Sequence, residues 1–340
     1  MNASSVMLPI GKLAPFYLSR LLEQYTSQDE TIIVGPQVGV DATVIDQGDH
    51  YLIAKTDPIT FVSDNIGYYA VHINANDIAC MGGTPHWFLA TLLLPVNLTT
   101  PDLVTLIFSQ LRGACDELHI MFCGGHTEIT HGINRPIIVG QMLGTVAKNS
   151  LIQPQHIKVG DDILLTKGIA IEATSIIARE KARALRQIYS EELVAKCQNY
   201  LFDPGISVVR EALLAVQTGG VHAMHDPTEG GLVTGLRELA QAAQVGLKII
   251  EDDIPILPES KLLCDQFGID PLGAIASGAL LIVVEPSATH RILEAFHQQQ
   301  LTIKTIGKIM PVDDGLVMVS NGQKSFLPEF QQDEITKLFH

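Results

Sequence analysis

The sequence has few cysteines, and their number and spacing argue against a zinc site and against a disulfide-stabilised fold. Five cysteines occur in 340 residues. No two are spaced as the ligands of a zinc site are, and the odd count argues against a disulfide framework. We therefore expect buried thiols in a protein of the reducing cytoplasm. The cysteines in question are Cys80, Cys115, Cys123, Cys197 and Cys264.

Basic residues are also scarce. Lysine and arginine number 22 against 37 acids, a formal net charge of −15. Nucleic acids and anionic membrane surfaces are bound by clustered positive charge, so neither is expected as a partner. No segment reaches the ~20 apolar residues of a membrane-spanning helix. The first residues lack the charged and then apolar stretch of a secretory signal.

Apolar residues make up 46% of the chain, which is enough for sizeable cores. At about 150 residues per domain, this length predicts two domains. Strand-like runs alternate with helical patterns along the chain, and the polar stretch 147–160 interrupts them. We expect an N-terminal domain over 1–150 and a C-terminal domain over 151–340, each built of helices and strands.

Two acids in the first 60 residues are candidate ligands, one after a glycine loop and one after an expected strand. Asp41 ends a tight loop that contains Gly39, and Asp57 follows an expected strand over 51–55. Pro58 holds the residue before it extended. Acids at such positions serve as metal or substrate ligands, and they are also common in ordinary turns. Both readings stay open for Asp41 and for Asp57.

An expected helix over 66–81 carries an unusual carboxylate. Ile66, Ala70, Ile73 and Asp77 share one stripe at helical spacing. Burying a polar group without a compensating partner costs on the order of 2–7 kcal/mol, so a carboxylate on an apolar face needs such a partner. The pattern favours Asp77 as a Mg²⁺ ligand over an Asp that bonds a neighbouring backbone group.

A glycine pair, Gly124 and Gly125, follows an expected strand over 119–123. Such a pair lets backbone N–H groups approach an anion, and a glycine hairpin turn is the alternative. The next residues include His126 and Glu128, which are candidate ligands or acid–base groups.

A second glycine pair, Gly230 and Gly231, is predicted to open a helix. Asp226, Thr228 and Glu229 precede it. A helix N-terminus preceded by glycines favours phosphate, and an ordinary N-cap is the alternative. Neither a Gly-Lys-Ser/Thr phosphate loop nor a strand-linked G-x-G-x-x-G is present, so the usual mononucleotide and dinucleotide folds are poor fits.

The order of these blocks resembles the superfamily of aminoimidazole ribonucleotide (AIR) synthetase, selenophosphate synthetase, thiamine-monophosphate kinase and HypE, the hydrogenase-maturation carbamoyl dehydratase. HypE is the member it resembles most. The resemblance rests on four blocks: Gly11-Lys12-Leu13-Ala14-Pro15, Val34-Gly35-Pro36 with Gly39-Val40-Asp41-Ala42, Ala70-Val71-His72 with Asn76-Asp77-Ile78-Ala79-Cys80-Met81-Gly82-Gly83, and His222-Ala223-Met224-His225-Asp226-Pro227-Thr228-Glu229-Gly230-Gly231-Leu232.

Several positions depart from the HypE pattern. His126 and Glu128 stand where HypE has an acid and then a lysine, Glu229 where it has an arginine, and Ser277 where it has an acid. HypE ends in a flexible tail whose terminal cysteine carries the carbamoyl group. This chain has no cysteine after Cys264, so the resemblance does not extend to that tail-borne step.

The resemblance implies an α+β fold of two α/β domains. The N-terminal strands would form a barrel across a homodimer, and the C-terminal half would be a ferredoxin-like sandwich of helices on a mixed sheet. ATP would lie in the cleft between the domains. By carry-over, Mg²⁺ would be held by Asp41, Asp57, Asp77 and Asp226, and ATP would contact Gly39, Lys55, Thr56, Asn76, Gly124, Gly125, Thr127, Asp226, Thr228, Gly230 and Gly231.

The implied activity is ATP- and Mg²⁺-dependent and ADP-forming. Asp77, His126 and Glu128 would be the catalytic residues. The reaction would phosphorylate an amide or carboxylate oxygen of a small molecule or a protein-borne group, in dehydration or cyclisation chemistry connected with metalloenzyme maturation. A kinase resembling thiamine-monophosphate kinase and a non-catalytic nucleotide-binding relative are the alternatives.

Overall fold

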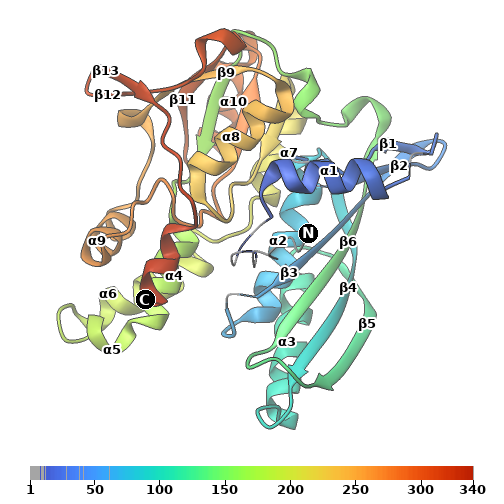
Figure 1. Ribbon diagram of the computed structural model, residues 1–340, viewed down its shortest axis with the longest axis vertical. Coiled ribbons are helices and arrows are strands. Elements are labelled where there is room, and N and C mark those ends of the chain that lie inside the picture. Colours follow the sequence, from blue (N-terminus) through green and yellow to red (C-terminus); the bar gives the residue numbers. More distant parts are fainter. Residues whose placement is uncertain are drawn as a thin grey trace, which may run out of the picture.

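Two sheets, one from each half of the chain, organise the molecule (Figure 1). The computed structural model describes residues 8, 11, 13–27, 29–37, 39–40, 42–60 and 62–339. The α+β class predicted from the sequence is confirmed. None of the helices in these residues is long and apolar enough to cross a membrane.

The first half places helices α2 and α3 against a six-stranded sheet of order β1-β2-β3-β6-β4-β5. Neighbouring strands are antiparallel except β4 and β5, which are parallel because α3 returns the chain between them. The elements are α1 (Pro15–Tyr25), β1 (Ile32–Val34), β2 (Thr43–Asp46), β3 (His50–Ile59), α2 (Ile66–Cys80), β4 (Thr84–Pro95), α3 (Pro101–Glu117), β5 (Met121–Thr130) and β6 (Ile137–Ala147).

The second half has a seven-stranded mixed sheet of order β13-β12-β9-β11-β7-β10-β8, in which only β9 and β12 are parallel. The predicted mixed sheet with helices is confirmed. The elements are β7 (Asp162–Thr166), α4 (Ile171–Glu180), α5 (Ala182–Leu185), α6 (Glu191–Gln198), α7 (Val209–Thr218), β8 (Val221–His225), α8 (Gly231–Ala243), β9 (Gly246–Ile250), α9 (Pro258–Phe267), β10 (Leu281–Val284), α10 (Pro286–Gln298), β11 (Ile303–Met310), β12 (Leu316–Ser320) and β13 (Gln323–Phe326).

The connecting segment 148–161 joins β6, the last strand of the first half in the sequence, to β7, the first strand of the second half. The domain boundary placed at residue 150 falls in this segment and stays a prediction. The first sheet is open, with β1 and β5 at its edges. A single chain therefore forms no closed barrel in the part the structure describes. The barrel expected across two copies stays a prediction.

Helix α2 lies at the centre of the first half. All fifteen of its residues are buried, so it has no solvent-facing side. It packs on α3, β3 and β6, and it also contacts α7 and β8 of the second half. A helix enclosed on all sides is typical of a core element, and the single apolar stripe predicted from the sequence describes only part of its surface.

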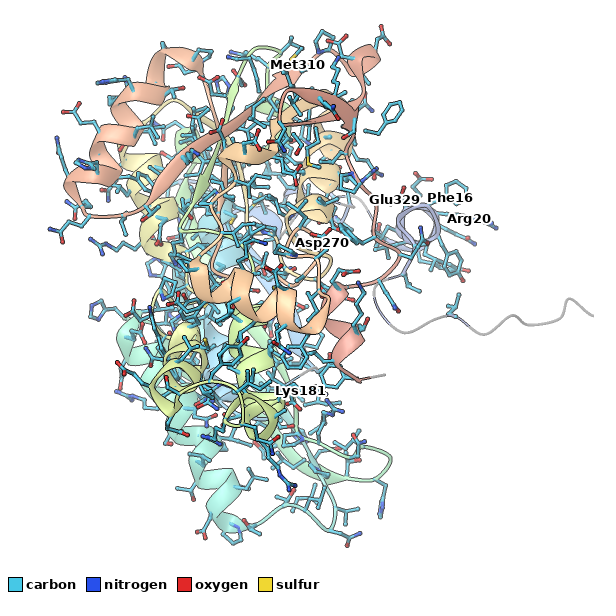
Figure 2. All side chains as sticks on the ribbon, turned by 90° about the vertical axis from the view of Figure 1, so that its left-hand side faces the viewer. Phe16, Arg20, Lys181, Asp270, Met310 and Glu329 are labelled. Atoms are coloured by element: carbon cyan, nitrogen blue, oxygen red, sulfur yellow. The ribbon has the colours of Figure 1, made fainter. Side chains whose placement is uncertain are left out.

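Helix α1 lies apart from these cores. Figure 2 shows Phe16 and Arg20 on this helix at one side of the molecule, and the Phe16 side chain is exposed. The chain's one tryptophan, Trp87, lies on β4 in the first sheet, where its ring centre is 5.2 Å from that of His86.

The first glycine pair differs from its prediction. We expected the strand to end at Cys123, but β5 continues through the motif to Thr130. The pairing with β4 shifts register between Phe88 and Leu89, so an irregularity lies where the glycines begin. A Cβ on Gly125 would lie 1.9 Å from the Ala90 carbonyl oxygen. The glycine pair therefore permits a close strand approach.

Replacing Gly125 by alanine should destabilise the protein more than the same change at Gly124. Both glycines have positive φ, but a Cβ at Gly124 meets no atom within 4 Å. The extra cost of overpacking at Gly125 should be roughly 1–3 kcal/mol. Urea unfolding of the two variants measures the difference. Equal losses would show that backbone conformation alone requires the glycines.

Candidate functional site

A buried ion pair forms the centre of the candidate site. The Lys55 Nζ atom lies 3.1 Å from Oδ2 of Asp77 and 3.5 Å from Oδ2 of Asp57. Lys55 and Asp57 come from β3, and Asp77 comes from the last turn of α2. The structure thus brings three predicted site residues together around one ammonium group.

The burial of Asp77 explains why this arrangement matters. Only 7% of the Asp77 side chain is exposed, against 36% for Asp57. A carboxylate in such a place needs an opposite charge or several hydrogen bonds. Lys55 supplies a compensating positive charge within the chain itself. The predicted role of Asp77 as a Mg²⁺ ligand stays a prediction.

Asp226 approaches the same helix from the second half. It follows β8 directly and is only 2% exposed. Its Oδ1 atom accepts a hydrogen bond from Sγ of Cys80 at 3.5 Å. Cys80 lies three residues after Asp77, so the two side chains share one face of α2. Asp226 therefore lies on the side of α2 that carries Asp77.

Asn76 joins the two halves. Its Nδ2 donates to the Ile206 carbonyl at 2.9 Å, and its Oδ1 accepts from the Val208 N–H at 2.8 Å. The Thr56 hydroxyl donates to the Gly140 carbonyl within the first sheet. Both side chains thus have internal partners beside the ion pair. Their contact with a nucleotide stays a prediction.

The glycine-acid loop of the first half lies on α8 of the second. A Cβ on Gly39 would be 2.9 Å from the Glu238 carbonyl oxygen. Glu238 also holds His225, whose Nε2 lies 3.2 Å from its Oε2. Asp41 lies outside the described residues, so its role as a metal ligand stays a prediction.

The second glycine pair begins a helix as predicted, since α8 starts at Gly231 with Gly230 in a left-handed conformation before it. The Gly230 N–H donates to Oδ2 of Asp333 at 2.6 Å, and the Gly231 N–H donates to the Thr228 carbonyl at 3.0 Å. Internal acceptors thus occupy both N–H groups. Phosphate contacts at Thr228, Gly230 and Gly231 stay a prediction.

The other predicted residues lie away from the ion pair within one chain. Gly124, Gly125, His126, Thr127 and Glu128 all lie on β5, three strand positions from β3 in the sheet order. At the usual strand spacing this is about 14 Å. His126 and Glu128 are exposed, and their Nε2 and Oε2 atoms are 3.4 Å apart. Their catalytic role stays a prediction.

Two buried acids near the start of α8 were not found from the sequence. Burial raises the pKa of Glu172 to about 7, and Asp333 adds to this effect. Burial likewise raises the pKa of Asp333 to about 6, against the lowering effect of three backbone N–H donors. Ser277 lies beside Glu172 and lowers its pKa in part. The departure at Ser277, where HypE has an acid, was the one sequence signal pointing here.

The donor set around Lys55 fits a hard divalent cation. Carboxylate oxygens are the ligands that Mg²⁺ prefers, and the Lys55 ammonium already places a positive charge between two of them. Among the residues that the structure describes, no three His, Cys, Asp or Glu side chains converge as a complete metal site.

The fold and these motifs define a class. Residues 39–146 match the family model of the AIR synthase related protein N-terminal domain, and residues 158–319 match that of its C-terminal domain. This chain belongs to the AIR synthase related family, and its similar relatives include HypE proteins.

Individual relatives agree with this assignment. The chain is 28% identical over 268 residues to a putative hydrogenase expression/formation protein of Methanocaldococcus jannaschii, covering 77% of this chain and 76% of that one. It is 28% identical over 259 residues to carbamoyl dehydratase HypE of Bradyrhizobium diazoefficiens, covering 74% and 70%. A solved structure of hydrogenase maturation protein HypE in complex with ATP superposes with a TM-score of 0.70 at 21% identity, covering 93% and 91%.

Replacing Glu172 by glutamine should make the protein less sensitive to alkaline pH. The folded pKa of about 7 lies above the usual 4.5, so the contribution of Glu172 to stability is complete below pH 4.5 and is lost as the pH rises through 7. Between pH 5 and pH 8, the free energy of unfolding of wild type should therefore fall by on the order of 2 kcal/mol more than that of the variant.

Chemical denaturation at the two pH values measures this gain. The control is Glu180→Gln, an exposed position on the same helix α4, where the pH dependence should match wild type. A Glu172→Gln variant that follows the wild-type pH dependence would contradict the assigned burial of the charge.

Proposed function

We propose that this protein is an ATP- and Mg²⁺-dependent, ADP-forming enzyme that phosphorylates an amide or carboxylate oxygen. The single observation that carries the proposal is the convergence of Asp57 and Asp77 on Lys55 in the first half, with Asp226 of the second half packed against the same face of α2. Family membership and the fold shared with an ATP complex of HypE support the nucleotide.

In this proposal, carboxylates hold the cation and Lys55 holds phosphate. Asp57, Asp77 and Asp226, together with Asp41, would hold Mg²⁺, which when bound would neutralise charge on the transferring phosphoryl group. Cation binding by Asp57 and Asp77 would release the Lys55 ammonium toward a phosphate oxygen. The Lys55 ammonium therefore offsets one of the two carboxylate charges within the chain itself and becomes available to phosphate when a cation takes its place.

The chemical purpose of the phosphorylation is to create a leaving group. An amide oxygen leaves poorly, whereas phosphate leaves well, so transfer of a phosphoryl group to that oxygen permits loss of water overall. The acceptor would be a small molecule or a group carried on a protein. The relative described as a putative hydrogenase expression/formation protein supports a setting in metalloenzyme maturation.

A homodimer is part of the proposal. Strand β5 forms an exposed edge of the first sheet, with Met121 and Ile129 more than half exposed. A second copy that pairs along this edge would cover apolar side chains and extend the sheet. In such a dimer, His126 and Glu128 would contribute to a site that both chains form together.

Binding of ATP tests the proposal directly. Isothermal titration of wild type should show binding that tightens when Mg²⁺ is added. In the Asp77→Asn variant the Mg²⁺-dependent part should fall by about 10- to 100-fold. Asp116→Asn, which changes an exposed carboxylate on α3, should bind as wild type does. Equal binding by all three proteins with no effect of Mg²⁺ would refute the metal assignment.

The fate of the phosphate separates the alternatives. Phosphorus NMR of reactions with amide-bearing compounds should show ADP and inorganic phosphate. A stable phosphorylated product would instead identify a kinase. Nucleotide binding without turnover across such compounds would identify a non-catalytic relative.

A further inference from the structure

The C-terminal segment, defined here as residues 327–339, is fixed to the second half along its length. Arg237 donates to the Leu327 and Pro328 carbonyls at 2.7 and 2.9 Å. Ile335 and Leu338 are buried in a core that α4, α6 and α9 share. The Lys181 Nζ donates to the Leu338 carbonyl at 2.7 Å. The segment is thus anchored at both ends.

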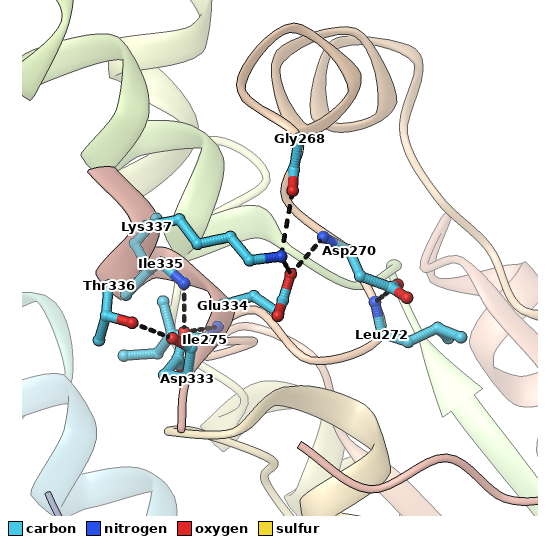
Figure 3. A network of polar contacts seen from close by, with 9 residues as sticks. All are labelled: Gly268, Asp270, Leu272, Ile275, Asp333, Glu334, Ile335, Thr336 and Lys337. Atoms are coloured by element: carbon cyan, nitrogen blue, oxygen red, sulfur yellow. Dashed lines mark hydrogen bonds and ion pairs between the residues drawn. The ribbon is translucent and has the colours of Figure 1, made fainter. Parts of the chain in front are cut away.

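One side chain in this segment connects two loops beside the candidate site. Asp333 is 3% exposed and accepts three main-chain hydrogen bonds. Its donors are Gly230 at 2.6 Å, Ile275 at 3.2 Å and Ile335 at 2.8 Å (Figure 3 shows the last two). The first donor immediately precedes α8, and the second belongs to the loop that leads into β10.

These loops also contact each other. The Ala276 N–H donates to the Thr228 carbonyl at 3.3 Å, two residues after Asp226. The loop from 226 to 230 therefore has Asp226 at one end, packed against Cys80 of α2, and Gly230 at the other, held by Asp333. A carboxylate that accepts three N–H groups can fix a loop of this length, because charge-assisted hydrogen bonds are strong.

We propose that Asp333 is a positioning residue of the candidate nucleotide site, and that the C-terminal segment is a fixed latch that sets the loop carrying Asp226. This inference rests on the proposed function only for the identity of the ligand. The latch joins the chain end to the site through Gly230 and Ile275.

The neighbouring carboxylate Glu334 provides a matched control. It lies in the same segment but binds elsewhere, since its Oε2 accepts from the Asp270 N–H at 2.9 Å and pairs with Lys337 (Figure 3). Loss of Glu334 therefore frees the Asp270 N–H, five residues before Ile275 in the same loop, and leaves the bonds of Asp333 to Gly230 and Ile275 in place. Asp333→Asn removes the charge at the latch itself.

Two measurements on the full chain test the latch. Hydrogen exchange of peptides covering 226–236 should quicken at least tenfold in Asp333→Asn and stay at the wild-type rate in Glu334→Gln. Titration with Mg·ATP, at a temperature where circular dichroism shows both variants folded, should give about tenfold weaker binding for Asp333→Asn and less than twofold for Glu334→Gln. If Asp333→Asn does not fold, Asp333→Glu carries the same comparison.

The outcomes are distinct. A lower melting temperature with unchanged exchange at 226–236 and unchanged affinity would show that Asp333 only stabilises the fold. Tighter Mg·ATP binding in Asp333→Asn would show that the carboxylate competes with phosphate at α8, and would also overturn the proposal. If wild type fails to bind Mg·ATP, the proposed function falls, and the exchange result still decides whether Asp333 fixes the loop.

Discussion

The charge buried at the end of α2 is the constraint on which the arrangement of this molecule depends. A helix enclosed on every side must place Asp77 and Asn76 in the interior. Lys55 from β3 compensates the acid, and the backbone at 206–208 satisfies the amide. Removing one partner of a buried ion pair is strongly destabilising, because the other charge then stays buried without compensation. The first sheet, α2 and the start of α7 therefore have one workable relative placement.

That placement also explains why the candidate site lies where the halves meet. β3 and α2 bring Lys55, Asp57 and Asp77 from the first half. The loop after β8 brings Asp226 from the second, and α8 receives the glycine loop at Gly39. Each half alone holds an incomplete set of charges. A ligand that needs both sets has to bind across the junction.

Much of this could be predicted from local pattern. The buried acid on α2 and the glycine start of α8 followed from helical spacing and from glycine before a helix, and the structure has both. The glycine pair at Gly124 was wrongly placed in a loop. Its signal, two glycines after an apolar run, is the same for a phosphate loop and for a strand pressed against Ala90. Asp333 could not be predicted, because its partner Gly230 lies 103 residues away in sequence.

The position of Trp87 has a practical consequence. It is the only tryptophan in the chain, and it lies on β4, beside the edge strand β5 of the first sheet and remote in sequence from the second sheet. Intrinsic fluorescence excited at the indole band therefore reports the environment of one half alone. Circular dichroism averages both sheets, so the two signals together distinguish a molecule that unfolds as a unit from one whose halves melt separately.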